Sequence, residues 1–237
     1  MKRNNARLLW LQCSQSRLRV IIQLTAAALI LLAATNVAGQ TPPRSATQIW
    51  SEQQLAIAVG KRVDLVLLGY LHVGRKSERP VAEHAATGIG VSIKLGTHLT
   101  VFPFYTHFEN QGLTSLHNKE ERLTLEATIR VSRKKLTFSD RNRLEYHWRK
   151  PQLNFIHYRN RPQIERSLNI WGLNGFVADE IFYDSHFSSF IRNRIYAGVS
   201  RKVNQHFSFE IYYMRQSDSH SRPGDLNVIG NTLKFRW

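Results

Sequence analysis

The most constraining feature of the sequence is a strict alternation of polar and apolar side chains along runs of about ten to fourteen residues. The run 120–132 shows it most clearly, because its even positions are polar or charged and its odd positions from Leu123 to Val131 are aliphatic. Successive side chains of a β-strand point to opposite faces, so a period of two predicts a strand with one polar and one apolar face. No sustained helical period follows residue 46, and the pattern therefore predicts an all-β chain.

Turn residues divide the sequence after residue 46 into eleven such runs. The runs are 49–59, 62–73, 87–95, 99–108, 120–132, 136–149, 153–167, 169–184, 188–202, 206–216 and 226–237. The connections are expected to alternate between tight turns and long loops. The tight turns are at Gly60, Gly96, Arg133 and Asn204, and the long loops are 74–83, 110–119 and 217–225. Bacterial single-chain barrels have even strand numbers, so eleven runs leave the count at ten to twelve.

Alternating strands fit two architectures that differ in which face points inward. In a soluble barrel of the lipocalin type the apolar face fills the core, whereas in a transmembrane barrel it faces lipid. The runs exceed the mean strand of about five or six residues and match the roughly nine to eleven that cross a bilayer at a tilt. Aromatic residues near run ends and a last run that stops at Trp237 favour the membrane. We predict a transmembrane, antiparallel, up-and-down β-barrel of about 10–12 strands, with a soluble periplasmic ligand-binding barrel as the alternative.

The N-terminal segment has the organisation of an export signal. Basic residues precede the apolar stretch 20–34, and Val37 and Gly39 then occupy the positions that signal peptidase reads, so cleavage is expected before Gln40. A retained signal anchor is the alternative. The predicted domains are a signal peptide, 1–39, a spacer, 40–46, and a barrel, 47–237. The single cysteine, Cys13, precedes the cleavage site, and a cysteine-free mature chain suits an oxidising compartment. We expect the mature chain in the outer membrane of a Gram-negative bacterium.

Five segments in the second half of the chain resemble a known series. They are DRNRLEY at 140–146, YRNR at 158–161, ADEIFYD at 178–184, RNRIYAGV at 192–199 and EIYYMRQ at 210–216. In this order they resemble the bacterial family called domain of unknown function 2490, and the resemblance covers roughly residues 47–237. It implies an outer-membrane β-barrel of a Gram-negative bacterium with no assigned activity, and it brings no catalytic residues. The sequence departs from the family pattern at Pro162, where a missing backbone donor predicts that the strand ends or bulges.

A transmembrane reading places the charged faces of the runs inside the barrel. The predicted interior ladder comprises Arg122, Glu126, Arg130, Arg141, Arg143, Glu145, Arg159, Arg161, Glu180, Arg192, Arg194 and Glu210. Neighbouring strands bring facing side chains within about 5 Å, close enough for arginines and carboxylates to pair. The ladder therefore has two interpretations, a salt-bridged structural filling or a cationic lumen that binds or passes small anions. No cofactor or metal is expected, because the ten histidines lack a metal-binding spacing such as H-E-x-x-H.

A lipid hydrolase of the Ser–His type is the rival function. Ser139 and His147 share one face of a run but lie about 26 Å apart at roughly 3.3 Å per residue, too far for the contact that a catalytic pair needs. A loop serine paired with His186 or His220 stays open. The chain is therefore not expected to be an enzyme, and a small pore or structural barrel is the leading interpretation.

The formal net charge of +16 predicts that the chain contacts negatively charged partners. Nucleic acid is excluded as a partner because an exported chain does not meet it. Outer-membrane lipid is expected instead, with the phosphates of lipopolysaccharide facing Arg75, Lys76 and Arg79. The closing strand that ends in Trp237 is expected to be recognised by the barrel-assembly machinery.

Overall fold

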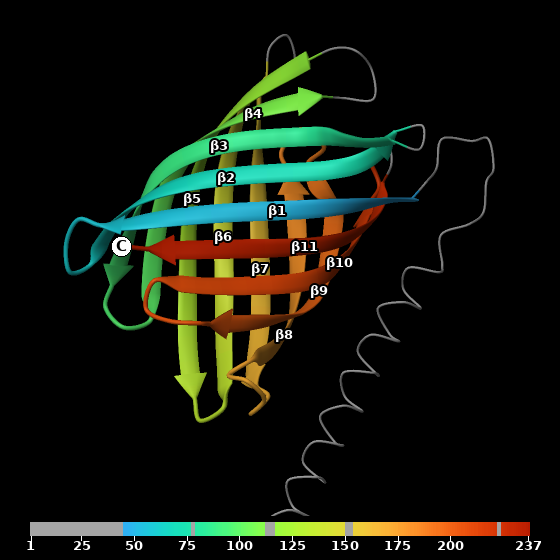
Figure 1. The fold of residues 1–237 in the computed structure, drawn as a ribbon. Coiled ribbons are helices and arrows are strands. Elements are labelled where there is room, and N and C mark those ends of the chain that lie inside the picture. The colour runs from blue at the N-terminus through green and yellow to red at the C-terminus, as the bar shows by residue number, and fades with distance from the viewer. Residues whose placement is uncertain (1–44, 77–78, 112–116, 150–153, 222–223) are drawn as a thin grey trace, which may run out of the picture. The chain divides into compact units, whose positions relative to one another are not determined.

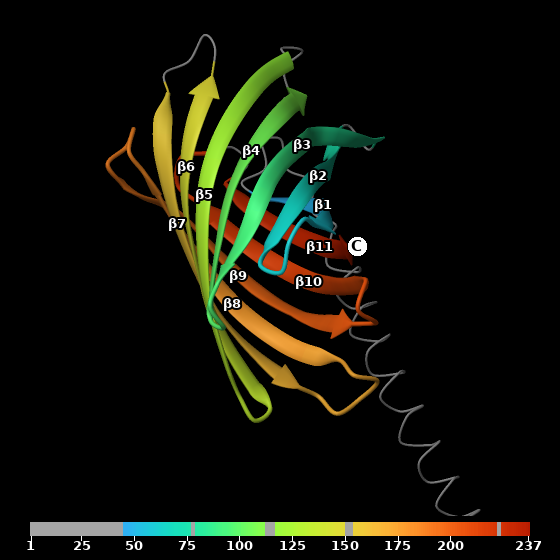
Figure 2. The same cartoon turned by 90° about the vertical axis from the view of Figure 1, so that its left-hand side faces the viewer.

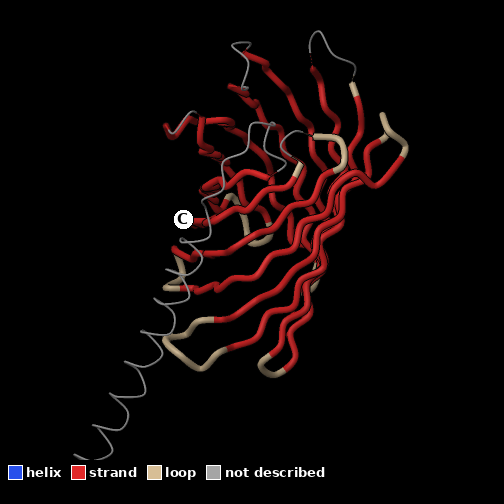
Figure 3. The backbone as a smooth tube through the Cα atoms, turned by 90° about the vertical axis from the view of Figure 1, so that its right-hand side faces the viewer, coloured by secondary structure: helices blue, strands red, loops and turns tan. Residues whose placement is uncertain are grey.

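The computed structural model describes residues 45–76, 79–111, 117–149, 154–221 and 224–237. The predicted signal peptide and nearly all of the predicted spacer lie outside these residues. Within the described residues, β-strand accounts for almost the whole chain, and the connections are confined to the two ends of the strands (Figure 3). No helix in this part of the chain has the length and apolar character needed to cross a membrane.

The described residues form eleven strands that close into one barrel (Figures 1 and 2). The strands are β1 (Ser45–Ala58), β2 (Val63–Lys76), β3 (Arg79–Leu95), β4 (Leu99–Gln111), β5 (His117–Arg133), β6 (Leu136–Arg149), β7 (Phe155–Ser167), β8 (Asn174–Asp184), β9 (Ser189–Lys202), β10 (Phe207–Asp218) and β11 (Asp225–Arg236). Each strand pairs with the next in an antiparallel ladder. The predicted all-β barrel of ten to twelve strands is confirmed.

The barrel closes through a parallel pair, β1 with β11, which explains the odd number of strands. Ile49 lies opposite Ile229 in this pair, and its ladder continues to the last residue, where Trp237 N–H donates to Ala56 O at 2.9 Å. Both strands therefore begin at the same end of the barrel. We call this end the N-terminal rim (the start of β1 and the connections after β2, β4, β6, β8 and β10), and the opposite end the C-terminal rim.

The predicted tight turns at Gly60, Gly96, Arg133 and Asn204 are short connections in the structure, but the predicted contrast with long loops at the other rim is not regular. The long loop expected at 74–83 is mostly strand, because β2 runs to Lys76 and β3 begins at Arg79, and these two residues are paired. Conversely, the connection between β7 and β8 at the C-terminal rim spans residues 168–173. Polar residues in this chain mark where the apolar face of a strand ends, and the backbone ladder continues beyond that point.

Pro162 neither ends nor bulges its strand, which corrects the prediction made from the sequence. It lies within β7 and opposite Asp140 of β6. On the other side, the ladder with β8 passes from Asn160 to Gln163 in the same register and omits the two residues between them. Proline lacks a backbone N–H, so only the β8 side loses ladder bonds.

The two faces of the barrel wall differ sharply in composition. Large apolar side chains are exposed on the outer face, among them Leu67, Ile89, Leu125, Ile195 and Ile229. The interior holds two apolar clusters and many charged groups. The larger cluster, here called the aromatic cluster, consists of Trp50, Phe176, Ala178, Tyr196, Tyr212, Met214, Leu226 and Val228. The smaller cluster consists of Val66, Leu68, Phe102 and Phe104.

Candidate functional site

Three Arg-Asn-Arg triplets supply much of the positive charge inside the barrel. They are 141–143 on β6, 159–161 on β7 and 192–194 on β9. Because side chains alternate along a strand, the two arginines of each triplet point inward and the asparagine points outward. Arg141 lies opposite Arg161, and Arg143 opposite Arg159. Like charges thus face each other on adjacent strands, and the interior needs carboxylates between them.

Glu180 of β8 is the carboxylate on which these arginines converge. It is fully buried, and its Oε1 accepts hydrogen bonds from Arg141 Nη2 and Arg159 Nη2, each at 2.9 Å. Its Oε2 accepts a hydrogen bond from the Tyr196 hydroxyl at 2.8 Å and lies 3.7 Å from Arg194 Nη1. A buried charge is tolerated only when it is paired and hydrogen-bonded. Glu180 therefore fixes the positions of three arginines at once.

Glu120 and Glu145 form a second centre, nearer the N-terminal rim. Arg122 Nη2 donates to Glu120 Oε1 at 2.7 Å, and Arg149 pairs with the other oxygen of the same carboxylate. Arg159 Nη1 donates to Glu145 Oε1 at 2.7 Å. Because Arg159 also binds Glu180, the two centres belong to one network.

Aromatic rings complete the environment of the arginines. The ring of the buried Phe182 has three guanidinium groups near it, at 4.5 Å for Arg159, 4.6 Å for Arg194 and 5.2 Å for Arg192. Each distance lies within the range of a cation–π interaction, which grows stronger when the cation is removed from water. The arginines are thus held both by carboxylates and by ring faces.

Most of the predicted interior ladder lies in this network, and two of its members lie apart. Arg130 is exposed near the C-terminal rim, where it pairs with Glu165 at 3.2 Å. Glu210 of β10 pairs with Lys234 of β11 at 2.8 Å. The other predicted residues, together with Glu120, form what we call the charged wall: Glu120, Arg122, Glu126, Arg141, Arg143, Glu145, Arg159, Arg161, Glu180, Arg192 and Arg194.

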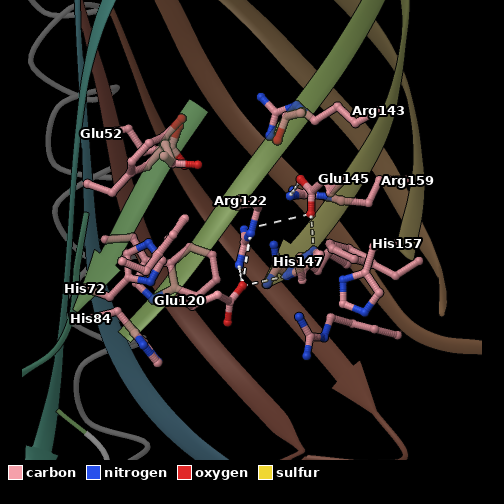
Figure 4. Close-up of a pocket in the computed structure, with 18 of the residues that line it drawn as sticks. Glu52, His72, His84, Glu120, Arg122, Arg143, Glu145, His147, His157 and Arg159 are labelled. Atoms are coloured by element: carbon pink, nitrogen blue, oxygen red, sulfur yellow. Dashed lines mark hydrogen bonds and ion pairs between the residues drawn. The ribbon is translucent and has the colours of Figure 1, made fainter. Parts of the chain in front are cut away.

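A cavity of about 490 Å³ adjoins the charged wall in the half of the interior nearer the N-terminal rim (Figure 4). Charged and imidazole groups reach it from both sides, with His72 and His84 on β2 and β3 and His147 and His157 on β6 and β7. Trp50 stacks on His72 with ring centroids 4.1 Å apart. The cavity therefore offers a polar, partly aromatic lining to a small ligand.

The sequence did not predict that two of these histidines lie beside a carboxylate. Glu145, His147 and His157 are all buried, and one potential ligand atom from each lies within 4.8 Å of the others. His157 Nε2 donates to Asp184 Oδ2 at 2.7 Å. The signal was present, because alternation places Glu145, His147 and His157 on the polar faces of two consecutive runs. Without the register of those runs, their proximity could not be read.

The asparagines of the triplets interrupt the apolar outer face on β6, β7 and β9. Asn160 Nδ2 donates to Asp140 Oδ1 at 2.7 Å and to Asn142 Oδ1 at 3.0 Å. Tyr158 OH donates to Asn142 Oδ1 at 2.6 Å, and Asn193 Nδ2 donates to Asp179 Oδ1 at 2.6 Å. These polar groups bond to one another, which lowers the cost of placing them on an otherwise apolar wall.

The loop between β10 and β11 brings a serine and a histidine together. Ser219 Oγ lies 2.7 Å from His220 Nδ1 in an exposed pair. Asp218 accepts the backbone N–H groups of His220 and Ser221, so this carboxylate does not orient the imidazole through a ring N–H. Among the described residues, no carboxylate bonds to the imidazole of this pair, which is the base-orienting contact that a hydrolytic triad uses.

Comparison with known proteins places the chain in a family without assigning an activity. The comparison with curated proteins finds no match. The sequence matches the family described as Protein of unknown function (DUF2490) over residues 47–227, which covers every strand of the barrel at least in part. The chain therefore belongs to the DUF2490 family.

Proposed function

We propose that the chain is an outer-membrane β-barrel whose interior is sealed by side chains around a ligand-binding cavity. The proposal rests on the direction of the two faces of the barrel wall, which is the reverse of that in a soluble barrel. Apolar side chains such as Leu125 and Ile195 are exposed on the outside, while Glu120 and Glu180 are buried inside. Soluble sheets bury the apolar face, and apolar surface exposed on this scale is typical of membrane contact.

The packing of the interior favours a sealed barrel over an open pore. Met214, Val228 and Glu180 are each 0 % exposed, so water does not reach these inward-facing side chains. In the charged wall, Arg161 is the one arginine without an ion pair among the described residues, and it lies over the Tyr196 ring at 4.2 Å. Eight-stranded barrels are filled by side chains and sixteen-stranded ones leave a channel. Pairing of nearly all these arginines supports a filled interior for eleven strands.

The expected orientation of the barrel in the outer membrane determines which rim meets which partner. The closing strand of an outer-membrane barrel is expected to end on the periplasmic side, which would place the C-terminal rim there and the start of β1 at the outer surface. The β2–β3 hairpin, with Arg75, Lys76 and Arg79, belongs to the N-terminal rim and would then face lipopolysaccharide phosphates. Replacing all three by neutral residues should weaken lipopolysaccharide binding, and unchanged binding would contradict this assignment. The strand ending in Trp237 is the part offered to the barrel-assembly machinery.

Two measurements on the same preparation test the proposal. Cell fractionation followed by gel electrophoresis of heated and unheated samples should find a folded, heat-modifiable band in the outer membrane. A soluble periplasmic protein without a mobility shift would contradict the membrane assignment. The purified barrel should then give no conductance steps in a planar bilayer. Anion-selective steps would show that the interior is open and would replace the sealed barrel with a pore.

A further inference from the structure

One edge of the cavity has the composition and geometry of a metal site. Glu145 and His147 of β6 and His157 of β7 all line the cavity, and each is less than a tenth exposed (Figure 4). We propose that these three side chains bind one divalent transition-metal ion of the zinc class. This inference rests on the proposed function in one respect, because the metal would occupy the cavity assigned above as the ligand site.

His147 presents an unpartnered nitrogen to Glu145. Its Nδ1 lies 2.5 Å from Glu120 Oε1, and an ionised carboxylate can only accept a hydrogen bond, so this nitrogen carries the proton. The lone pair of a neutral ring is then on Nε2, which is buried and has no hydrogen-bond partner among the described residues. Glu145 Oε2 lies 3.3 Å from Nε2. Two electron-rich atoms thus face each other, an arrangement that a cation between them would stabilise.

The separation of these two atoms matches a tetrahedral ion. Zinc binds nitrogen and oxygen ligands with bonds of about 2.0–2.2 Å, which places two ligands of a tetrahedron roughly 3.3–3.5 Å apart. His157 supplies the third ligand, since one potential ligand atom from each of the three residues lies within 4.8 Å of the others. Two histidines and one carboxylate are the donor set of many catalytic zinc and non-haem iron sites. The cavity leaves space for a fourth ligand that the protein does not supply.

Both histidines have the outer-sphere partners that metal-binding histidines usually have. His147 donates to Glu120 through Nδ1, and His157 donates to Asp184 through Nε2 at 2.7 Å. Each carboxylate fixes the ring tautomer and leaves the other nitrogen with a lone pair that can bind a metal. Arg159 occupies Glu145 Oε1 at 2.7 Å, whereas Oε2 faces His147 Nε2 and has Arg122 Nη1 at 3.8 Å, beyond hydrogen-bond distance. Glu120, Glu145 and Asp184 supply negative charge around the ion, and Arg122, Arg149 and Arg159 balance the two glutamates.

Metal titration of the folded, chelator-treated barrel in detergent tests the proposal. Zinc should bind with one ion per chain by calorimetry, and Co²⁺ should give the visible absorption of a tetrahedral complex. His147→Ala and His157→Ala should abolish both signals. Asp184→Asn should weaken zinc binding by roughly 10–100-fold, because it removes an outer-sphere partner only. His98→Ala is the matched control, since His98 lies exposed in the β3–β4 connection and does not line the cavity, and it should leave binding unchanged.

Absence of zinc and cobalt binding to the folded wild-type barrel would overturn the proposal, as would unchanged binding in both triad variants. If the wild-type barrel binds neither metal, a proton on His147 Nε2 would bridge this nitrogen and Glu145 in place of the ion. Heat-modifiability on a gel verifies that each variant is folded. If the alanine variants do not fold, Asp184→Asn decides the matter by the loss of zinc-dependent thermal stabilisation seen in the wild type. A barrel that fractionates with the outer membrane but binds no metal would contradict this inference alone and leave the proposed function standing.

Discussion

The charged wall and the aromatic cluster meet at Tyr196, which donates to Glu180, but they fill the interior by different physical means. In the charged wall, Glu180 is surrounded by arginines whose positions are fixed by hydrogen bonds and ring faces. In the aromatic cluster, Tyr212 and Met214 pack against apolar neighbours. Gly198 has no side chain and so leaves room for the Phe176 ring. Apolar packing tolerates many exchanges of similar volume, whereas a buried ion-pair network fails when one partner is removed. The difference predicts that the wall is the more sensitive of the two to the loss of a single side chain and that it fixes the placement of ligand groups.

The largest effect is expected at the centre of the charged wall. Glu180→Ala should reduce the free energy of unfolding by about 3–5 kcal/mol, because Arg141, Arg159 and Arg194 would keep their buried charge without this partner. Urea titration of the barrel in lipid vesicles, followed by tryptophan fluorescence, measures the change. Glu210→Ala removes a carboxylate with one ion-pair partner, Lys234, and should cost clearly less. Equal losses would show that the wall is not a cooperative network.

A charge on the outer wall lacks the partners that the interior provides. Leu125→Arg should reduce the free energy of unfolding in lipid vesicles by about 2–4 kcal/mol if Leu125 lies near the middle of the bilayer. Val203→Arg, in the connection at the C-terminal rim, is the control and should cost less than about 1 kcal/mol. If both substitutions are equally mild, the apolar outer face does not contact lipid.

The aromatic cluster contains no charged side chain, so its stability should depend on how closely its side chains pack. A Cβ at Gly198 would collide with the backbone oxygen of Ile211 and come within 2.9 Å of the Phe176 ring. Gly198→Ala should therefore reduce the free energy of unfolding by about 1–3 kcal/mol through overpacking. At Gly60, no atom lies within 4 Å of an added Cβ, so Gly60→Ala should have little effect in the same urea titration. A neutral Gly198→Ala would mean that the cluster is loosely packed.

The smallest effect is expected for an ion pair outside the barrel interior. Arg215 and Asp225 pair at 3.2 Å on the exposed side of the N-terminal rim. Water and salt screen such pairs, so Arg215→Ala should change the free energy of unfolding by less than about 1 kcal/mol. A loss comparable to that of Glu180→Ala would remove the distinction between buried and exposed ion pairs on which the comparison depends.

The sequence predicted the strands and the faces of their side chains well, because alternation with a period of two reports both directly. Alternation places Glu180 on the polar face of its strand and Leu125 on the apolar face, and the choice of a transmembrane barrel then predicts that the polar face points inward. The parallel closure between β1 and β11 was not predicted, since it depends on which two ends of a curved sheet meet. The triad of Glu145, His147 and His157 depends on the register between two strands, which residue types do not report. The true extent of β2 and β3 was missed because polar strand ends resemble loops.

The most direct test of the account is lipid accessibility along β5. The predicted mature chain has no cysteine, so single cysteines at positions 122–129 can each carry a fluorophore in a lipid-reconstituted barrel. Brominated lipids should quench the probe at positions 123, 125, 127 and 129 and should leave positions 122, 124, 126 and 128 largely unaffected. Quenching at the even positions, or no alternation at all, would contradict a barrel that turns its apolar face to lipid and its charges inward.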